Sequence, residues 1–168
     1  MDRRRGRRLA GLAVVALLAL AMASAVAMAR DGTRWVVVRD AAGVELARTA
    51  LPPSNEFALR YRNSVYESIA EEHFRVVGGH LRLAELAADE LAVLEEYYTA
   101  VGAVHNEAGA GRTWRVAVER PSIALPLHVQ ATALGERTLL VAESEIALWR
   151  LVAGRDGTLV VLSVEESE

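Results

Sequence analysis

Nine side chains stand out among the fourteen positions from Arg60 to His73 as able to form hydrogen bonds, carry charge or transfer protons. They are Arg60, Tyr61, Arg62, Asn63, Ser64, Glu67, Glu71, Glu72 and His73. No other segment of the chain combines so many such side chains with so regular an apolar pattern. We therefore expect the functional surface to include this segment, and the elements around it decide which of these side chains meet.

Alternation of apolar and polar residues predicts that the segment consists of two strands joined by a polar connection. In residues 57–62, Tyr61 shares one face with two apolar residues, because successive side chains of a strand point to opposite sides. In residues 70–76, Phe74 marks the core face, and Glu72 shares that face. A carboxylate on a core face is costly unless it is paired or hydrogen-bonded.

We therefore predict a polar cluster at the mouth of the core, built from Glu72, Tyr61, Asn63 and the Ser64 hydroxyl. On the opposite face, Arg60 and Arg62 are placed to pair with Glu71 across the strands, and such exposed pairs contribute roughly 0.2–1 kcal/mol each. The candidate residues for binding a ligand or partner are Arg60, Tyr61, Asn63, Ser64 and Glu72. The competing interpretation is a structural corner that satisfies the turn between the two strands.

The same stretch resembles the DUF1850 family, small exported bacterial proteins of unknown function that are often encoded beside TRAP-type transporters working with TAXI-class solute-binding proteins. The family's motif usually reads His-Ser-Val, followed by a glutamate two places before an aromatic residue. Asn63, Ser64 and Val65 occupy the first motif, with asparagine in place of histidine, and Glu72 and Phe74 occupy the second. The resemblance covers about residues 35–162. It implies a transporter subunit or a solute-binding protein as partner, and no known activity.

Residues 1–29 have the anatomy of a secretory signal. Five arginines between residues 3 and 8 precede the apolar run of residues 9–29, and small residues permit cleavage after Ala27 or Ala29. The alternative is an uncleaved N-terminal anchor, because about 20 apolar residues span a bilayer. Both interpretations place residues 30–168 outside the cytoplasm, as a periplasmic or extracytoplasmic domain that is either secreted or anchored.

The charge of the exported part limits its partners. The chain has 19 basic and 22 acidic residues, and residues 1–29 take five arginines and one aspartate, so residues 30–168 hold 14 and 21, a net charge of −7. This charge disfavours nucleic acid and anionic lipid as partners. Membrane contact is expected only through an uncleaved N-terminal segment. The chain has no cysteine, which excludes disulfides, thiol nucleophiles and lipoprotein anchoring.

Short segments of strand-like sequence with turn signals between them predict a mainly β fold, an antiparallel β-sandwich or barrel of about eight to nine strands. The predicted strands are residues 35–38, 44–49, 57–62, 70–77, 81–87, 114–119, 125–133, 138–142 and 158–164. Residues 89–101 change to a helical period and predict one short amphipathic helix capped by Asp89. Residues 145–152 fit a strand or a short helix, and the acidic tail, residues 165–168, is predicted to fray.

The sequence does not contain the familiar catalytic or cofactor-binding motifs. The spacing of His73, His80, His105 and His128 does not match a zinc site. Ser64 lacks the Gly-x-Ser-x-Gly elbow of hydrolases, and no phosphate-binding glycine loop follows a strand. We therefore expect no catalytic residue, no metal and no cofactor.

The sequence favours a non-catalytic extracytoplasmic accessory or binding domain, and the resemblance implies association with a TRAP-TAXI type solute transporter. One alternative is a small-ligand-binding protein or hydrolase that uses Glu72 and Asn63. Another is a structural envelope protein. The binding accessory predicts an exposed apolar patch beside the polar cluster, and the ligand binder or enzyme predicts a concave pocket.

Overall fold

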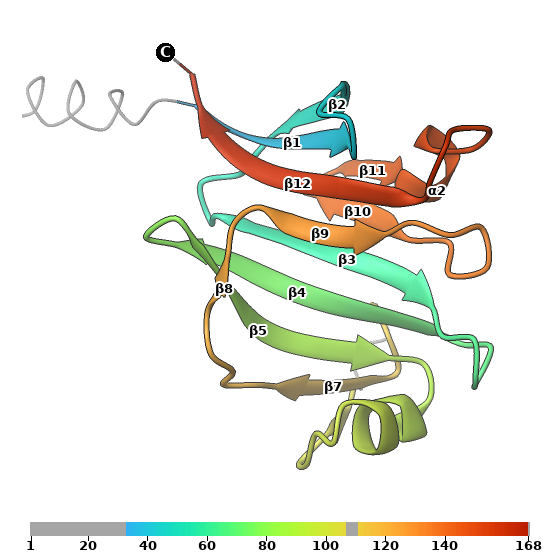
Figure 1. Ribbon diagram of the computed structural model, residues 1–168. Coiled ribbons are helices and arrows are strands. Elements are labelled where there is room, and N and C mark those ends of the chain that lie inside the picture. Colours follow the sequence, from blue (N-terminus) through green and yellow to red (C-terminus); the bar gives the residue numbers. More distant parts are fainter. Residues whose placement is uncertain (1–32, 107–110, 168) are drawn as a thin grey trace, which may run out of the picture. The chain divides into compact units, whose positions relative to one another are not determined.

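Two antiparallel sheets account for most of residues 33–106 and 111–167, the part of the chain that the computed structural model describes (Figure 1). The predicted leader, residues 1–29, lies outside this part. The smaller sheet has the spatial order β2 (Glu45–Ala50), β1 (Arg34–Asp40), β12 (Leu159–Glu166) and β9 (Leu127–Gln130). The larger sheet has the order β11 (Ser144–Ala147), β10 (Thr138–Val141), β3 (Glu56–Arg62), β4 (Ile69–Val77), β5 (His80–Ala88), β7 (Trp114–Ala117) and β6 (Val104–His105), with β8 (Ile123–Ala124) also pairing with β5.

The hydrophobic core lies where the two sheets face each other. The small sheet contributes residues such as Val36 and Leu162, and the large sheet contributes residues such as Leu59, Leu86 and Leu139, all of them fully buried or nearly so. The prediction of a mainly β, antiparallel fold is confirmed as an open, sandwich-like arrangement. The described residues form twelve strands, more than the sequence predicted, because short pairings such as β6 and β8 carry little alternation of their own.

Two hairpin turns form where the sequence between predicted strands carries typical turn residues. Gly78 and Gly79 join β4 to β5 with φ angles of 56° and 77°, positive values that glycine adopts without steric cost. The Asp40 side chain accepts hydrogen bonds from the backbone N–H groups of Ala42 and Val44, at 3.0 and 2.9 Å, and so closes the turn between β1 and β2.

The predicted amphipathic helix over residues 89–101 is wrong in length and in its cap. The helical segment η1 is a π-helical turn over Val93–Tyr97. It ends in a Schellman-type turn, with Thr99 at a φ of 52° and the N–H of Ala100 bonded to the carbonyl of Leu94 at 2.9 Å. Asp89 does not cap the helix, because its carboxylate accepts a hydrogen bond from Arg112 instead.

The C-terminal part resolves one ambiguity and corrects one prediction. The segment that fitted a strand or a helix is both, β11 followed by the short helix α2 (Leu148–Leu151). The acidic tail was predicted to fray from residue 165, yet β12 continues to Glu166. Ion pairs account for this difference, because Arg39 and Arg48 both pair with the Glu165 carboxylate.

Candidate functional site

The pairing of β3 with β4 places the two adjacent glutamates on opposite faces of the large sheet. Glu71 lies opposite Arg60, and Glu72 lies opposite the buried Leu59. The Glu72 side chain therefore enters the space between the sheets, and the Glu71 side chain lies on the outer face. This is the arrangement that the alternation predicted.

On the inner face, Glu72 is held by side chains from two distant segments. The Tyr98 hydroxyl donates to Glu72 Oε1 at 2.7 Å, and the hydroxyls of Tyr98 and Tyr61 are 2.6 Å apart. Arg137 Nη1 lies 3.5 Å from the other carboxylate oxygen, and its guanidinium stacks 4.7 Å above the centre of the Tyr61 ring. We call these four residues the Glu72 network.

Burial keeps the two tyrosines of the network neutral. It raises the pKa of Tyr61 to about 12, and it raises the pKa of Tyr98 further, with the Glu72 charge acting in the same direction. Both hydroxyls therefore remain protonated hydrogen-bond donors over the physiological range. The network is thus suited to holding a partly buried carboxylate rather than to transferring a proton.

The Glu72 network and the hydrogen bonds beside it connect three segments at one end of the sandwich. Residues 63–68 connect β3 to β4, residues 131–137 cross from β9 in one sheet to β10 in the other, and η1 precedes Tyr98 (Figure 1). Two further contacts link them: the Tyr66 hydroxyl donates to Glu96 at 2.5 Å, and the N–H of Arg62 donates to the carbonyl of Gly135 at 2.8 Å. We call these three segments together the loop end.

The predicted polar cluster is correct for Tyr61 and Glu72 and wrong for Asn63 and Ser64. Asn63 is buried, but its Oδ1 accepts hydrogen bonds from the N–H groups of Val65 and Tyr66, at 2.9 and 3.1 Å. Ser64 is exposed on the same turn. Among the hydrogen bonds of the described residues, none joins either side chain to Glu72. Asn63 is bound into its own turn because an asparagine side chain readily bonds to the backbone two or three residues on.

The predicted ion pairs of Arg60 and Arg62 with Glu71 are also wrong. Arg60 Nη2 lies 2.5 Å from Glu145 Oε2, and Arg62 lies 3.7 Å from Glu67 within its own loop. Glu71 instead has His73 Nε2 at 3.1 Å and Arg112 Nε at 3.3 Å. Arg112 comes from the segment before β7, so it can reach over the outer face in a way that the strand pairing alone does not indicate.

Glu71 is buried although it lies on the outer face of the sheet. The hydrogen bond from His73 lowers the pKa of Glu71 against the opposing effect of burial, and the charge of Arg112 lowers it further. Arg112 also lies 3.0 Å from Asp89, just after β5. The outer carboxylate is therefore fixed by partners from its own strand and from a distant segment, as the inner carboxylate is.

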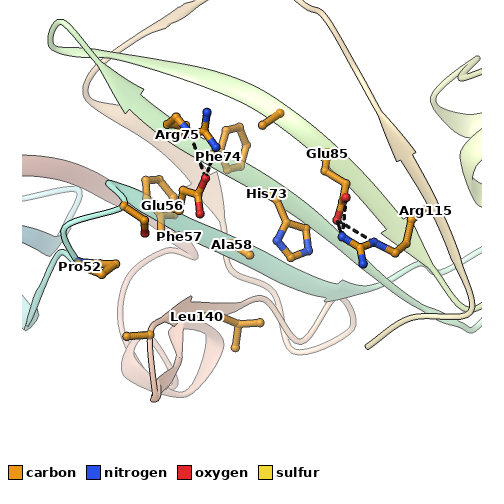
Figure 2. Close-up of a pocket in the computed structure, with 13 residues that line it drawn as sticks. Pro52, Glu56, Phe57, Ala58, His73, Phe74, Arg75, Glu85, Arg115 and Leu140 are labelled. Carbon is orange, nitrogen blue, oxygen red and sulfur yellow. Dashed lines mark hydrogen bonds and ion pairs between the residues drawn. The ribbon is translucent and has the colours of Figure 1, made fainter. Parts of the chain in front are cut away.

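A hollow of about 610 Å³ lies on the outer face beside Glu71 (Figure 2). Figure 2 shows His73 near its middle and an ion pair on each side, Glu56 with Arg75 and Glu85 with Arg115. Arg115 Nη2 lies 2.7 Å from Glu85 Oε2. Small and apolar side chains, including Ala58, Ala84 and Leu140, line the rest. The hollow thus offers charges of both signs around an apolar floor.

Three large apolar side chains are exposed on the loop end. Val65 is 72 % exposed, Leu134 is 71 % exposed and Tyr97 is 60 % exposed. They lie on the three segments that the Glu72 network and its neighbouring hydrogen bonds join. Single exposed apolar residues are common on protein surfaces, so what distinguishes these three is that they lie on segments connected by hydrogen bonds.

Other kinds of site find no support in the described residues. Residues 33–106 and 111–167 contain no group of three or more His, Asp or Glu side chains placed to hold a metal ion. Within the same ranges, no helix is long and apolar enough to cross a membrane.

Sequence reasoning missed Tyr98, Arg112 and Arg137. Tyr98 was assigned to a helix face, and the two arginines were assigned to loops. Tyr98 is 26 positions from Glu72, and Arg137 is 65 positions from it, so no local spacing relates them. The only available signal was Glu72 itself, since a carboxylate on a core face requires a partner.

Compared with known proteins, the chain matches no family model, no curated protein and no solved structure. The resemblance to the DUF1850 family stays a prediction based on the motif residues.

Replacing Tyr98 with phenylalanine tests the Glu72 network. The substitution removes one hydroxyl and leaves the Tyr61 hydroxyl and the Glu72 carboxylate without that partner, so we expect a loss of about 1–3 kcal/mol in the free energy of unfolding. The matched control is Tyr97→Phe on the neighbouring exposed ring, which should change it by less than about 0.5 kcal/mol. Urea denaturation measures both, and equal effects of the two substitutions would contradict the network.

The lowered pKa of Glu71 predicts a pH dependence of stability. A carboxylate whose pKa is depressed in the folded state stabilises the fold above its unfolded pKa, near 4.5, and this contribution is lost as the pH falls through the folded value. Below about pH 4.5, the free energy of unfolding of the wild type should therefore fall more steeply than that of Glu71→Gln. Urea denaturation across this pH range measures it. The exposed Glu67→Gln variant should follow the wild type, and parallel profiles for all three proteins would refute the assignment.

Proposed function

We propose that the chain is a non-catalytic extracytoplasmic binding domain that docks onto a partner protein through the loop end. The observation that carries this proposal is the exposure of Val65, Leu134 and Tyr97 on three connected segments. The Glu72 network holds two of these segments, and the Tyr66–Glu96 hydrogen bond links the third to η1. These three exposed side chains are our candidates for the apolar surface that a binding accessory would use.

The way the loops are fixed supports a binding role. Ordering a flexible loop on binding costs conformational entropy, and a loop that is already held in place avoids much of that cost. Here Asn63 closes one loop, Arg137 holds the next, and Tyr98 holds the end of η1. The apolar side chains are thus presented on segments whose positions are set before a partner arrives.

The class of partner follows from the resemblance rather than from the geometry. A DUF1850-like accessory implies a transporter subunit or a solute-binding protein, and an apolar docking surface suits a protein partner. The net charge of −7 on residues 30–168 gives no attraction to nucleic acid. The extracytoplasmic location rests on the leader, residues 1–29.

The hollow on the outer face favours a second candidate function, the binding of a small ligand. Its rim alternates arginine and glutamate on both sides of His73, and its floor is apolar. A zwitterionic molecule with a short apolar side chain, such as a free amino acid, matches both features. In this candidate the ligand binds in the hollow and not at Glu72 and Asn63, because the side chains of both residues already form internal hydrogen bonds.

Photo-crosslinking from the loop end tests the first proposal. A photoreactive phenylalanine in place of Leu134, in the full chain produced in its native envelope, should form an adduct with a transporter subunit or a solute-binding protein, identified by mass spectrometry. The matched control places the same group at Val44, which is also exposed but follows the β1–β2 turn in the small sheet. Equal labelling from both positions, or no adduct from Leu134, would refute docking through the loop end.

Nuclear magnetic resonance titration with free amino acids tests the second candidate. We expect saturable shifts of the backbone amides of His73, Glu85 and Arg115, and their loss in Arg115→Gln, which breaks the ion pair on one side of the hollow. The control variant is Arg48→Gln, which breaks a similar arginine–glutamate pair on the small sheet and should leave the shifts unchanged. Absence of shifts with every amino acid would exclude this ligand class.

A further inference from the structure

The corner formed by the β4–β5 hairpin gathers exposed basic side chains. Arg75 of β4 lies directly opposite Arg82 of β5, an arrangement that is unfavourable because like charges face each other. His80 and Arg120 lie at the same corner and line one shallow depression together with Arg82. All four side chains are exposed. We call Arg75, His80, Arg82 and Arg120 the basic corner.

The charges of the basic corner are only partly balanced. Glu56 pairs with Arg75 at 2.9 Å, and the almost fully exposed Glu119 lies 4.0 Å from Arg82. Arg120 donates to the carbonyl of Tyr98 at 2.6 Å, which orients its guanidinium without neutralising it. Two carboxylates thus accompany three arginines, in a domain whose net charge is −7. Since screening limits charge interactions to about 10 Å, a nearby anionic surface responds to this local excess more than to the net charge.

Exposed apolar side chains accompany these charges. Val77, at the tip of the hairpin, is 54 % exposed. Ile123, 39 % exposed on β8, lies opposite the buried Leu81 and therefore on the core face of this edge, whereas Val77 lies opposite His80 on the outer face. Basic side chains beside exposed apolar ones are typical of surfaces that rest on a bilayer, where the apolar groups enter the interface and the cations meet the headgroups.

The chain enters the domain next to this corner. The guanidinium of Arg34, at the start of β1, bonds to the side chain of Asn55, and the carbonyl of Asn55 accepts the N–H of Val76 at 2.9 Å. Residues 9–29 form an apolar run of 21 residues, so only residues 30–33 separate that run from Arg34. Four residues span at most about 14 Å. If the run crosses a bilayer, the hairpin therefore stays close to the headgroups.

We propose that the basic corner contacts the surface of a bilayer that contains anionic phospholipid, with residues 9–29 as the uncleaved anchor. The contact orients the tethered domain and needs little affinity of its own, because the anchor keeps the two surfaces at a high effective concentration. The proposal goes beyond docking through the loop end. The β4–β5 hairpin and residues 63–68 lie at opposite ends of β4, whose nine residues extend over about 30 Å. Arg120, through its hydrogen bond to Tyr98, is the member of the basic corner that reaches toward the loop end.

Site-specific labelling of the full chain in lipid nanodiscs tests this contact. The chain has no cysteine, so Val77→Cys gives a unique position for a fluorophore, and Leu134→Cys gives the matched control on the loop end. With phosphatidylglycerol in the disc, a quencher attached to the lipid headgroups should quench the label at position 77 more than the label at position 134. In pure phosphatidylcholine discs, the difference should shrink.

Charge substitutions complete the test. Replacing Arg82 and Arg120 with glutamine should lower the surface-bound fraction of the label at position 77, by about fivefold for each arginine. Arg62→Gln on the loop end should leave it unchanged. Quenching at position 77 that is independent of lipid charge, or insensitive to the two arginines, would overturn the proposal. Crosslinking from Leu134 does not depend on this result, so failure here is distinguishable from failure of the proposed function.

Discussion

The carboxylate of Glu72 is the group on which the loop end depends. A charged group between two sheets loses its hydration, a cost of several kcal/mol that only pairing and hydrogen bonds offset. Tyr98 and Arg137 supply these contacts, and Tyr61 binds the Tyr98 hydroxyl. Tyr98 and Arg137 lie far from Glu72 in the sequence, so satisfying this one carboxylate helps to fix the end of η1 and the crossing between the sheets relative to β4. The backbone hydrogen bond from Arg62 to Gly135 holds the crossing in the same place.

On the outer face of β4, the Glu71 carboxylate is also held by side chains, from its own strand and from a distant segment, but it lies beside the hollow instead of at the loop end. Glu71 is satisfied by His73 and Arg112, and Arg112 reaches on to Asp89. These contacts cover the outer face next to the hollow and leave the arginine–glutamate pairs of its rim exposed. Two adjacent residues of one strand thus organise both surfaces to which we assign candidate functions. The same strand runs from residues 63–68 of the loop end to the β4–β5 hairpin of the basic corner.

The strands and hairpin turns were largely predictable because they follow from alternation and turn residues in the local sequence. Alternation placed Tyr61 and Glu72 on the core face, and the Gly78–Gly79 pair and Asp40 marked their turns correctly. The prediction failed where a distant contact outweighed the local pattern. Tyr98 leaves the helical period to reach Glu72, and Glu165 stays in β12 because of Arg39 and Arg48. The prediction for Asn63 failed for a local reason. Its side chain accepts a hydrogen bond from the backbone of its own turn and therefore does not bond to Glu72.

Amide hydrogen exchange in Glu72→Gln tests the central claim most directly. If Glu72 holds the loop end together, protection should fall for the amides of Arg62 and Tyr66, whose hydrogen bonds lie in or between its loops. The amides of Val36 and Val38, in the pairing of β1 with its neighbours, should exchange as in the wild type. Unchanged exchange at the loop end, or an equal loss of protection throughout both sheets, would contradict the account, because Glu72 would then be either dispensable or merely one contributor to global stability.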